Sequence, residues 1–254
     1  MISLATANRE YPRGLARLQA RLRESGFPGD VLVWPPGSFP AGCPTRLESP
    51  FAFKPFCFRE AAERGYESIL WLDSSCVPLQ PLDPLFDELE SSGTLLFRNR
   101  DYRVGEWCSD DALAELGLTR DEACDLPEVN AAAVGLDLRH PVAATFLEEW
   151  HAAAVAGTAF RGTREPLATE ADYHAVKWNR EGRVSADPRV RGHRHDQTVA
   201  GVLAHRLGLP LREGGIERLR RGRGGSVVSS GTVIAIEPPA RPAARSRIAR
   251  FLRR

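Results

Sequence analysis

An apolar strand pattern that stops at a single carboxylate is the most constraining feature of this chain. Residues 68–78 read Ser-Ile-Leu-Trp-Leu-Asp-Ser-Ser-Cys-Val-Pro. An uninterrupted apolar run is typical of a strand buried on both faces, as in a parallel sheet covered by helices. Open α/β sheets bind their ligands at the carboxyl ends of the strands. The pattern therefore predicts an α/β fold with Asp73 at the ligand-binding edge, although Asp-Ser-Ser also suits an ordinary turn.

Strand and helix patterns alternate along most of the 254 residues, whose 43% apolar content is typical of a soluble globular protein. We expect strands at 2–7, 30–34, 68–73, 94–97, 129–138 and 227–236. Helical patterns lie at 14–25, 54–64, 82–91, 109–116, 141–156, 170–178 and 198–207. This alternation predicts a single, Rossmann-like α/β domain over residues 1–236, with a mostly parallel sheet flanked by helices.

Residues 237–254 form a basic segment, which we expect to be a flexible C-terminal tail. From Arg212 to Arg254 there are eleven arginines and three glutamates, a net charge of +8. Apolar residues between the last arginines would suit peripheral contact with an anionic membrane face, while the same composition suits a solvated tail. The segment carries no recognisable nucleic-acid-binding motif, so we expect no nucleic-acid partner.

The five cysteines are odd in number and form no C-x-x-C pair. This pattern favours reduced thiols in a cytoplasmic protein and argues against a disulfide framework or a cysteine-built zinc site. We find no signal-peptide pattern and no apolar run long enough to span a membrane. We therefore expect a cytoplasmic protein, with peripheral contact at the inner membrane face through the tail.

Several common motifs are missing, and their absence narrows the functional class. No G-x-G-x-x-G or P-loop lysine motif follows the first strand, and no G-x-S-x-G elbow occurs. These absences argue against dinucleotide-binding dehydrogenases, P-loop NTPases and α/β-hydrolases. The polar residues that remain at predicted strand ends and helix starts are Asn8, Arg9, Lys54, Asp73, Asn130 and the cluster His193-Arg194-His195-Asp196-Gln197.

These residues resemble the donor-binding core of the GT-A fold glycosyltransferases. The similarity begins with Phe51-Ala-Phe-Lys-Pro-Phe, a helix, and the strand that ends in Asp-Ser-Ser. Val129-Asn-Ala-Ala-Ala-Val-Gly resembles the Asn-and-Gly strand of glycosyltransferase family 8, and Asp196-Gln-Thr-Val resembles its Asp-Gln helix start. The resemblance covers residues 2–210. It implies a hexosyltransferase of polysaccharide biosynthesis that moves a sugar, with retention, from a nucleotide-diphosphate sugar to a saccharide or lipid-linked acceptor.

The resemblance also implies roles for individual residues. Asp196 and Gln197 would line the reacting face of the sugar. The donor would be bound by Asn8, Arg9, Lys54, Asp73, Ser74, Ser75 and Asn130. A divalent metal, Mn²⁺ or Mg²⁺, would be held by Asp73 and Ser75 together with His193 and His195.

The chain departs from the family pattern at one metal ligand. Where the D-x-D motif has its second carboxylate, this chain has Ser75. A carboxylate and a hydroxyl hold a hard cation less tightly than two carboxylates do. Either a histidine completes the metal site, or Lys54 and an arginine balance the charge of the leaving diphosphate without a metal.

Plainer interpretations remain open for each of these residues. Lys54 also suits a solvated helix start, Asn130 a buried loop contact, and Asp196 a helix N-cap. Ser75 suits a nucleotide-sugar-binding protein of the same fold without transferase activity. A sugar-phosphate nucleotidyltransferase is a further alternative, but residues 6–11, Thr-Ala-Asn-Arg-Glu-Tyr, lack the Gly-rich basic loop that such enzymes have after the first strand.

Overall fold

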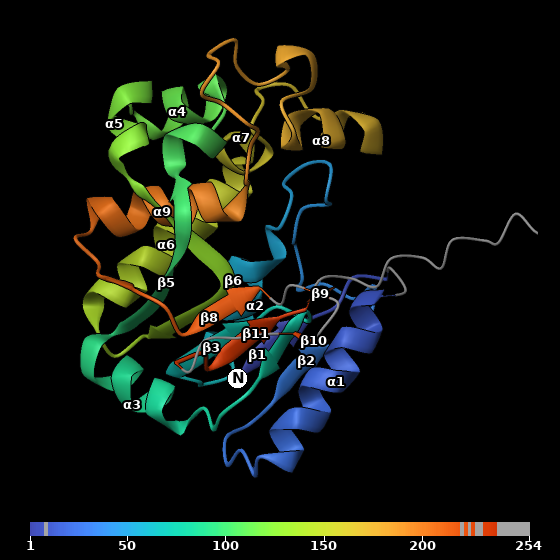
Figure 1. The fold of residues 1–254 in the computed structure, drawn as a ribbon, viewed down its shortest axis with the longest axis vertical. Helices are drawn as coiled ribbons and strands as arrows, with labels where there is room; N and C mark the ends of the chain where they lie inside the picture. The colour runs from blue at the N-terminus through green and yellow to red at the C-terminus, as the bar shows by residue number, and fades with distance from the viewer. Residues whose placement is uncertain (8–9, 219–220, 223–224, 227–230, 238–254) are drawn as a thin grey trace, which may run out of the picture.

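Six strands form one central sheet in the computed structural model (Figure 1), which describes residues 1–7, 10–218, 221–222, 225–226 and 231–237. The strands follow the order β2-β1-β3-β6-β5-β7 across the sheet. Their bounds are β1 Ile2–Leu4, β2 Leu32–Trp34, β3 Ser68–Leu72, β5 Thr94–Arg103, β6 Pro127–Asp137 and β7 Leu211–Arg212. Strand β6 pairs antiparallel with β3 and β5, and the other pairs are parallel. Only β6 therefore runs against the rest, and the predicted mostly parallel sheet is confirmed.

Strand β3 is buried on both faces, as its continuous apolar pattern predicts. Ile69 and Trp71 face one hydrophobic cluster, and Leu70 and Leu72 face a second cluster on the other side of the sheet. The first cluster contains residues of helices α2 (Phe53–Glu63), α4 (Asp110–Leu116), α5 (Arg120–Asp125), α6 (Pro141–Ala156), α7 (Thr158–Arg161) and α9 (Asp196–Arg206). The second contains residues of α1 (Glu10–Glu24) and α3 (Asp83–Ser92). Helices thus cover both faces of the sheet.

A second, smaller sheet lies beside the end of β3. It has the order β4-β11-β8, with bounds Cys76–Pro78, Ile234–Ile236 and Ile216–Arg218. Of the predicted last strand, 227–236, only residues 234–236 are strand in the described part of the chain. Residues 231–233 are not strand, and residues 227–230 lie outside the described part. A short hairpin joins β9 (Arg221–Gly222) to β10 (Gly225–Ser226). Of these short strands, only β11 falls within a strand that the sequence pattern predicts.

Helices α4, α5, α7 and α8 (Glu170–Lys177) gather at one end of the molecule, at the top of Figure 1. Two 3₁₀ turns, η1 (Val104–Trp107) and η2 (Arg180–Gly182), accompany them. Thr119 and Glu122 form a capping box at the start of α5, a local signal that the apolar pattern alone does not reveal. Strand β5 extends beyond the predicted residue 97 to Arg103, because pairing with β6 continues through an irregular, polar stretch.

The strand ends and helix starts that carry the predicted site residues meet at one edge of the sheet. Asp73 follows β3 directly, at its carboxyl end. Because β6 is reversed, its first residues reach this same edge. Helix α2 begins here with Lys54 in its first turn, and α9 begins here with Asp196. The candidate functional residues therefore lie together at this edge of the sheet.

Some predictions fall on residues that the structure does not describe. Asn8 and Arg9 lie outside the described residues, as does the segment 238–254 with its proposed membrane contact. Among the residues that are described, no helix is long and apolar enough to cross a membrane.

Candidate active site

The Lys54 ammonium group is the centre of the candidate site. Its side chain is only 3% exposed, and the Nζ atom lies 3.1 Å from Asp73 Oδ1 and 2.7 Å from Asp196 Oδ2. It also donates a hydrogen bond of 2.7 Å to the backbone oxygen of Ala131. One buried cation thus joins the end of β3, the reversed strand β6 and the start of α9. The alternative interpretation of Lys54 as a solvated helix-start residue is wrong, since its side chain is buried.

The ammonium of Lys54 and the carboxylates of Asp73 and Asp196 stabilise one another's charges. Burial lowers the pKa of Lys54, but the Asp196 and Asp73 carboxylates outweigh this effect, and the pKa is raised overall. Burial raises the pKa of Asp196, and the Lys54 ammonium opposes that rise. The two head groups form a close ion pair, with 2.7 Å between Lys54 Nζ and Asp196 Oδ2. Lys54 is therefore a fixed positive charge at neutral pH.

Asp73 faces both the protein and the solvent. Its Oδ1 atom accepts a hydrogen bond of 2.8 Å from the indole Nε1 of Trp71, in addition to the contact with Lys54. The side chain is 32% exposed. Ser74, the next residue, is buried against α1. A Cβ atom on Gly14 of this helix would lie only 2.2 Å from the backbone oxygen of Ser74. Ser75 is half-buried. The turn 73–75 is thus held in place by α1, and the second oxygen of Asp73 is left for a ligand.

Asp196 and Gln197 open helix α9 after a strained residue. His195 stands at the N-cap position with φ 52° and ψ −115°, so Asp196 is the first helical residue and not the cap. A positive φ is unfavourable for a side chain such as histidine and persists only where the surroundings enforce it. Gln197 is half-buried beside Asp196. The strained turn directs Asp196 towards Lys54.

Asn130 lies near the start of β6, at the same edge. Its side-chain oxygen accepts a hydrogen bond of 3.2 Å from the backbone nitrogen of Ala132. Ala132 in turn accepts a hydrogen bond of 2.8 Å from the backbone nitrogen of Asp73. Asn130 is half-buried, so its side chain supports the backbone at Ala132 and is also partly exposed to solvent. The structure brings Lys54, Asp73, Asn130 and Asp196 to one place, as the sequence motifs imply.

The two histidines of the predicted metal site are turned into the protein. His193 is fully buried; its Nδ1 accepts a hydrogen bond of 3.3 Å from the Ser109 nitrogen, and its Nε2 lies 3.0 Å from the Ala159 oxygen. Both ring nitrogens are therefore bound to backbone groups, and burial lowers the pKa of His193 to about 4. His195 stacks on Tyr173 with centroids 5.2 Å apart, and its Nδ1 lies 2.8 Å from the Phe160 oxygen. Burial also lowers the pKa of His195 well below its usual value.

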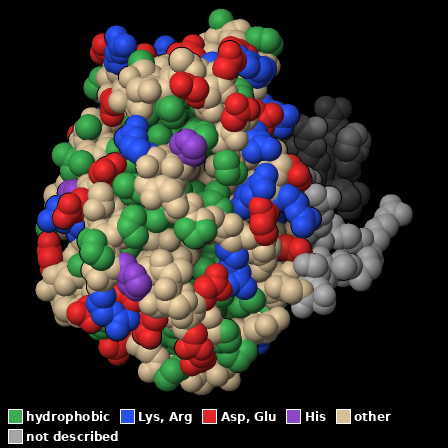
Figure 2. Space-filling model, turned by 90° about the vertical axis from the view of Figure 1, so that its left-hand side faces the viewer, with side chains coloured by type: hydrophobic (Ala, Val, Ile, Leu, Met, Phe, Trp, Pro, Cys, Tyr) green, Lys and Arg blue, Asp and Glu red, His purple; other side chains and the backbone are tan. Residues whose placement is uncertain are grey.

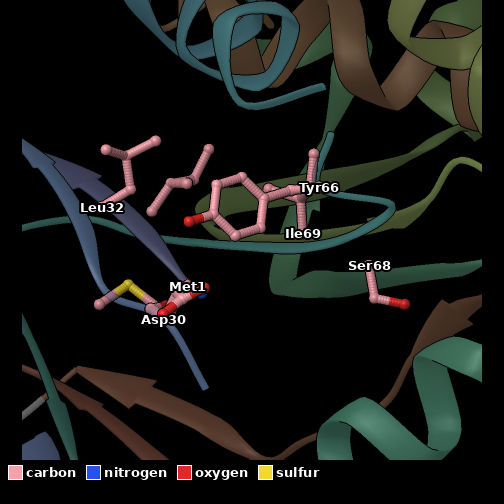
Figure 3. A pocket seen from close by; sticks show the side chains of 7 residues that line it. Met1, Asp30, Leu32, Tyr66, Ser68 and Ile69 are labelled. Atoms are coloured by element: carbon pink, nitrogen blue, oxygen red, sulfur yellow. The ribbon is translucent and has the colours of Figure 1, made fainter. Parts of the chain in front are cut away.

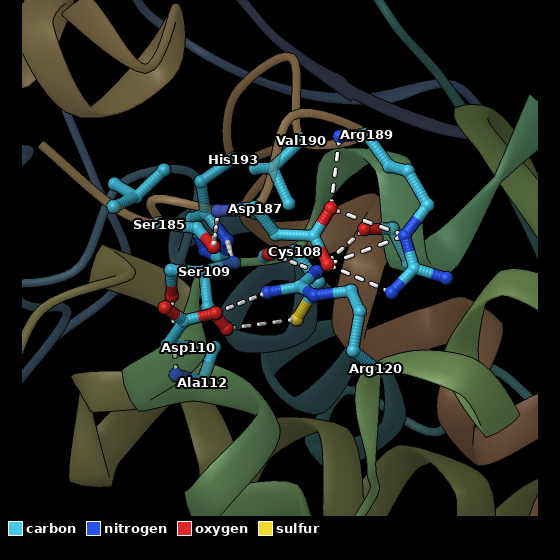
Figure 4. Close-up of polar contacts among 12 residues, drawn as sticks. Cys108, Ser109, Asp110, Ala112, Arg120, Ser185, Asp187, Arg189, Val190 and His193 are labelled. Atoms are coloured by element: carbon cyan, nitrogen blue, oxygen red, sulfur yellow. Dashed lines mark hydrogen bonds and ion pairs between the residues drawn. The ribbon is translucent and has the colours of Figure 1, made fainter. Parts of the chain in front are cut away.

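Two arginines hold the segments that lie near His193 (Figure 4). Arg120 donates to the Cys108 oxygen at 2.6 Å and to the Asp110 carboxylate at 2.5 Å. Arg189 bonds to Asp187 within the loop and to Asp121 on α5. The Arg189 contacts tie residues 187–189 to α5, while Arg120 holds the residues at the start of α4.

The residues present do not fit the divalent metal that the sequence resemblance implies. In the described part of the chain, no three His, Cys, Asp or Glu side chains are grouped to hold a metal ion. The residues outside it contain none of these four types. The predicted set of Asp73, Ser75, His193 and His195 is therefore not assembled. The ammonium of Lys54 lies between the two carboxylates instead.

A buried carboxylate at the same edge is missed by the sequence analysis. Glu128 on β6 is fully buried, accepts a hydrogen bond of 2.5 Å from Asn99, and lies 3.7 Å from Arg194. Burial raises the pKa of Glu128 to about 7, against the effect of Arg194. Glu128 lies two residues before Asn130, and alternate residues of a strand share a face. That spacing is the signal that could have found it.

Basic and aromatic side chains lie near the start of α9. The Arg46 guanidinium lies 4.1 Å from the ring centroid of Tyr173, and the Lys177 Nζ lies 5.7 Å from the same ring. Arg194 lies 4.2 Å above the ring of Trp107. Burial lowers the pKa of Lys177, and the charges of Arg46 and Arg194 lower it further. The three cations are thus close to one another, and Arg46 and Arg194 are also paired with Glu170 at 3.2 Å and Glu128 at 3.7 Å.

Two pockets of the described structure are not lined by Lys54, Asp73 or Asp196. One is a shallow pocket lined by residues such as Met1, Asp30 and Ser68 (Figure 3), at the amino ends of β1 and β3. A second is lined by residues of α9, β7 and the start of β6, among them Gly201 and Leu211. The face in Figure 2 mixes acidic and basic side chains, without one dominant sign of charge. The charged group around Lys54 therefore lies outside both of these hollows.

No protein-family model matches the chain, and no curated protein matches it. Among solved structures, the apo form of mouse xyloside xylosyltransferase 1 aligns with 92% of this chain and 96% of its own, at 14% identity and a TM-score of 0.49. The galactosyltransferase LgtC, in complex with donor and acceptor sugar analogues, aligns with 96% of this chain and 89% of its own, at 13% identity and a TM-score of 0.42. The bifunctional glycosyltransferase WbbM, in an apo structure, aligns with 61% of this chain and 34% of its own, at 15% identity and a TM-score of 0.37. The matched structures are glycosyltransferases, the class that the sequence motifs resemble, but these likenesses assign no role to a residue of this chain.

Proposed function

We propose that this protein is a glycosyltransferase that moves a sugar from a nucleotide-diphosphate sugar to a saccharide or lipid-linked acceptor. The observation that carries the proposal is the buried ammonium of Lys54 between the carboxylates of Asp73 and Asp196. This group lies at the carboxyl edge of an α/β sheet, where ligands of such sheets bind. A buried charge cluster costs stability unless its geometry is good, so its presence at a ligand-binding edge favours a functional role.

The residues at this edge suit the parts of such a donor. Asp73 and the hydroxyls of Ser74 and Ser75 end the central strand, beside the diphosphate in our proposal. Asp196 and Gln197 would line the sugar, and Asn130 would contact the donor from the start of β6. Asn8 and Arg9 follow the first strand and would contact the nucleoside. Lys54 holds the two carboxylates at fixed positions, and so it orients both groups before a donor arrives.

The chemistry needs a stabilised leaving group. The bond between the sugar carbon C1 and the diphosphate oxygen breaks, while a bond forms between C1 and the acceptor hydroxyl oxygen. We propose retention, with the acceptor approaching on the side of the leaving group, so that its proton passes to the departing phosphate oxygen. Because Asp196 is bound to Lys54, its carboxylate orients sugar hydroxyls in this proposal and forms no covalent bond. Fixed positive charge near the phosphates lowers the barrier as negative charge develops there.

The test uses release of nucleoside diphosphate from a panel of UDP-, GDP-, ADP-, CDP- and dTDP-sugars, with and without mixed oligosaccharide acceptors. We expect turnover with one donor class, and a loss of about a hundredfold or more in Asp73→Asn and Asp196→Asn. Asp137→Asn is the matched control, because Asp137 is a buried carboxylate at the other end of β6. Full turnover in both site variants would show that this edge is not the active site.

One alternative has a specific observation in its favour. Ser75 replaces the second acidic residue of the metal motif, as in a protein that binds nucleotide sugars without transferring the sugar. The same panel separates the two functions. Binding of a donor in calorimetry, without release of nucleoside diphosphate under any condition, would favour the binding protein over the transferase.

A further inference from the structure

The space between the two site carboxylates is already filled by a cation that belongs to the chain. The Lys54 Nζ atom lies 2.7 Å from Asp196 Oδ2, 3.1 Å from Asp73 Oδ1 and 2.7 Å from the Ala131 oxygen. Asp73 Oδ1 accepts a second hydrogen bond from Trp71. A divalent ion bound to both carboxylates at the usual distance of about 2 Å would have to displace this ammonium. An ion bound to Asp73 alone would lie beside a buried charge of its own sign, which repels it.

We propose that the protein binds its nucleotide-diphosphate donor without a divalent metal, with Lys54 in the place of the ion between the carboxylates and with Arg46, Lys177 and Arg194 around the anion. The inference rests on the proposed function, since it concerns the same donor. It also explains why Ser75 is sufficient where the resembling family has a carboxylate: there is no metal to coordinate. The metal site expected from the sequence is thereby replaced by a set of basic side chains.

Charge balance is the reason that further cations are needed. Asp73, Asp196 and Lys54 together carry a net charge of −1, and a diphosphate adds at least about two more negative charges. Lys54 is held by its three partners and is nearly fully buried, so it does not turn towards the phosphates. Positive charge for the diphosphate must therefore come from side chains that are closer to the solvent.

The three basic residues are placed for this role by aromatic rings. Arg46 and Lys177 both contact the ring of Tyr173. Tyr173 stacks on His195, the residue before Asp196, with an interplanar angle of 15°. Arg194 is two residues before Asp196 and is held over Trp107. The chain of contacts from ring to ring places positive charge near the start of α9. Arg46 also lies 3.2 Å from Glu170 and Arg194 lies 3.7 Å from Glu128, so these two arginines share their charge with carboxylates outside the Lys54 group.

The experiment compares binding of UDP, GDP, ADP, CDP and dTDP by calorimetry in EDTA and in Mn²⁺. We expect the nucleotide that binds to do so with affinities that agree within about threefold in the two conditions. Lys177→Met should weaken binding about tenfold or more, because it removes a charge-assisted contact. Arg206→Met, at the far end of α9, is the matched control and should leave the affinity unchanged.

A direct titration of Mn²⁺ without nucleotide, followed by electron paramagnetic resonance, gives a second readout. We expect the signal of free Mn²⁺ to persist in the presence of the wild-type protein. A tight Mn²⁺ site that Asp73→Asn removes, or nucleotide binding that is lost in EDTA and restored by Mn²⁺, would overturn the inference while leaving the transferase proposal intact. If no nucleotide bound in either condition, the proposed function would fail, and this inference would fail with it.

Discussion

Replacement of Lys54 by methionine tests whether the candidate site is built on a charged ammonium. The change keeps most of the side-chain volume but leaves the Asp196 carboxylate, which is 3% exposed, without its cation. Removal of one partner from a buried ion pair costs about 3–5 kcal/mol, because the other charge stays buried and unpaired. The pairing with Asp73 adds little to this cost, since that side chain is 32% exposed and is screened by solvent. We therefore expect the free energy of unfolding of Lys54→Met to fall by about 3–5 kcal/mol.

The assay is urea denaturation at pH 7.5, followed by the fluorescence of tryptophans such as the fully buried Trp71. The chain has only one other lysine, so Lys177→Met is a matched control. Burial and neighbouring arginines destabilise the charged form of Lys177. Removal of this charge should therefore change the free energy of unfolding by less than about 1 kcal/mol. The double variant Lys54→Met/Asp196→Asn should recover about 2 kcal/mol or more, because no unpaired charge remains at Asp196. A loss below about 1 kcal/mol in Lys54→Met would refute the claim that a charged pair is buried here.

Two buried titratable groups predict opposite pH dependences that nearly cancel in the wild-type protein. Glu128, whose pKa is raised to about 7, binds more protons in the folded state, so its contribution to stability is largest at low pH and declines by about 2 kcal/mol from pH 5 to 7.5. His193, whose pKa is lowered to about 4, must lose stability as the pH falls from 6.5 towards 4, by about 2 kcal/mol at pH 5. In urea denaturation at both pH values, Glu128→Gln should become less stable towards pH 5 relative to wild type, and His193→Gln more stable. Parallel pH profiles for all three proteins would contradict these assignments.

The parts of the fold that the sequence predicts well are those with local signals. Helix α6 begins at Pro141 and ends at Ala156, as predicted, because proline starts it and Gly157 follows its last residue. Strand β3 is recognisable because it is apolar on both faces. The short strands β4, β7 and β8 have two or three residues each and take their structure from distant partners. No local sequence pattern predicts these three strands.

The candidate site shows the same division. Position at a predicted strand end or helix start is a local property, and it identifies Lys54, Asp73 and Asp196 as candidate site residues. The burial of Lys54 is decided by Ala131 and Asp196, which are distant in the chain, so the sequence alone leaves a solvated lysine open beside a donor contact. His193 is a similar case, because the backbone groups that occupy its ring nitrogens come from α7 and the residue before α4. A histidine next to an Asp-Gln pair therefore resembles a metal ligand until its partners are known.

The direction of strand β6 determines which of its residues belong to the site. If β6 ran parallel to β3, its last residue, Asp137, would lie at the edge with Asp73, and the ion pair of Asp137 with Arg139 would be part of the site. Because β6 is antiparallel, Asp137 pairs with Ser68 at the opposite end of β3, and the first residues of β6 reach the site instead. This reversal supplies the Ala131 oxygen that binds Lys54, and it brings Glu128 to the same edge. The chain thus has two buried carboxylates on one strand with different consequences: a change at Asp137 should act on stability alone, while a change at Glu128 also acts on the charges around Asp196.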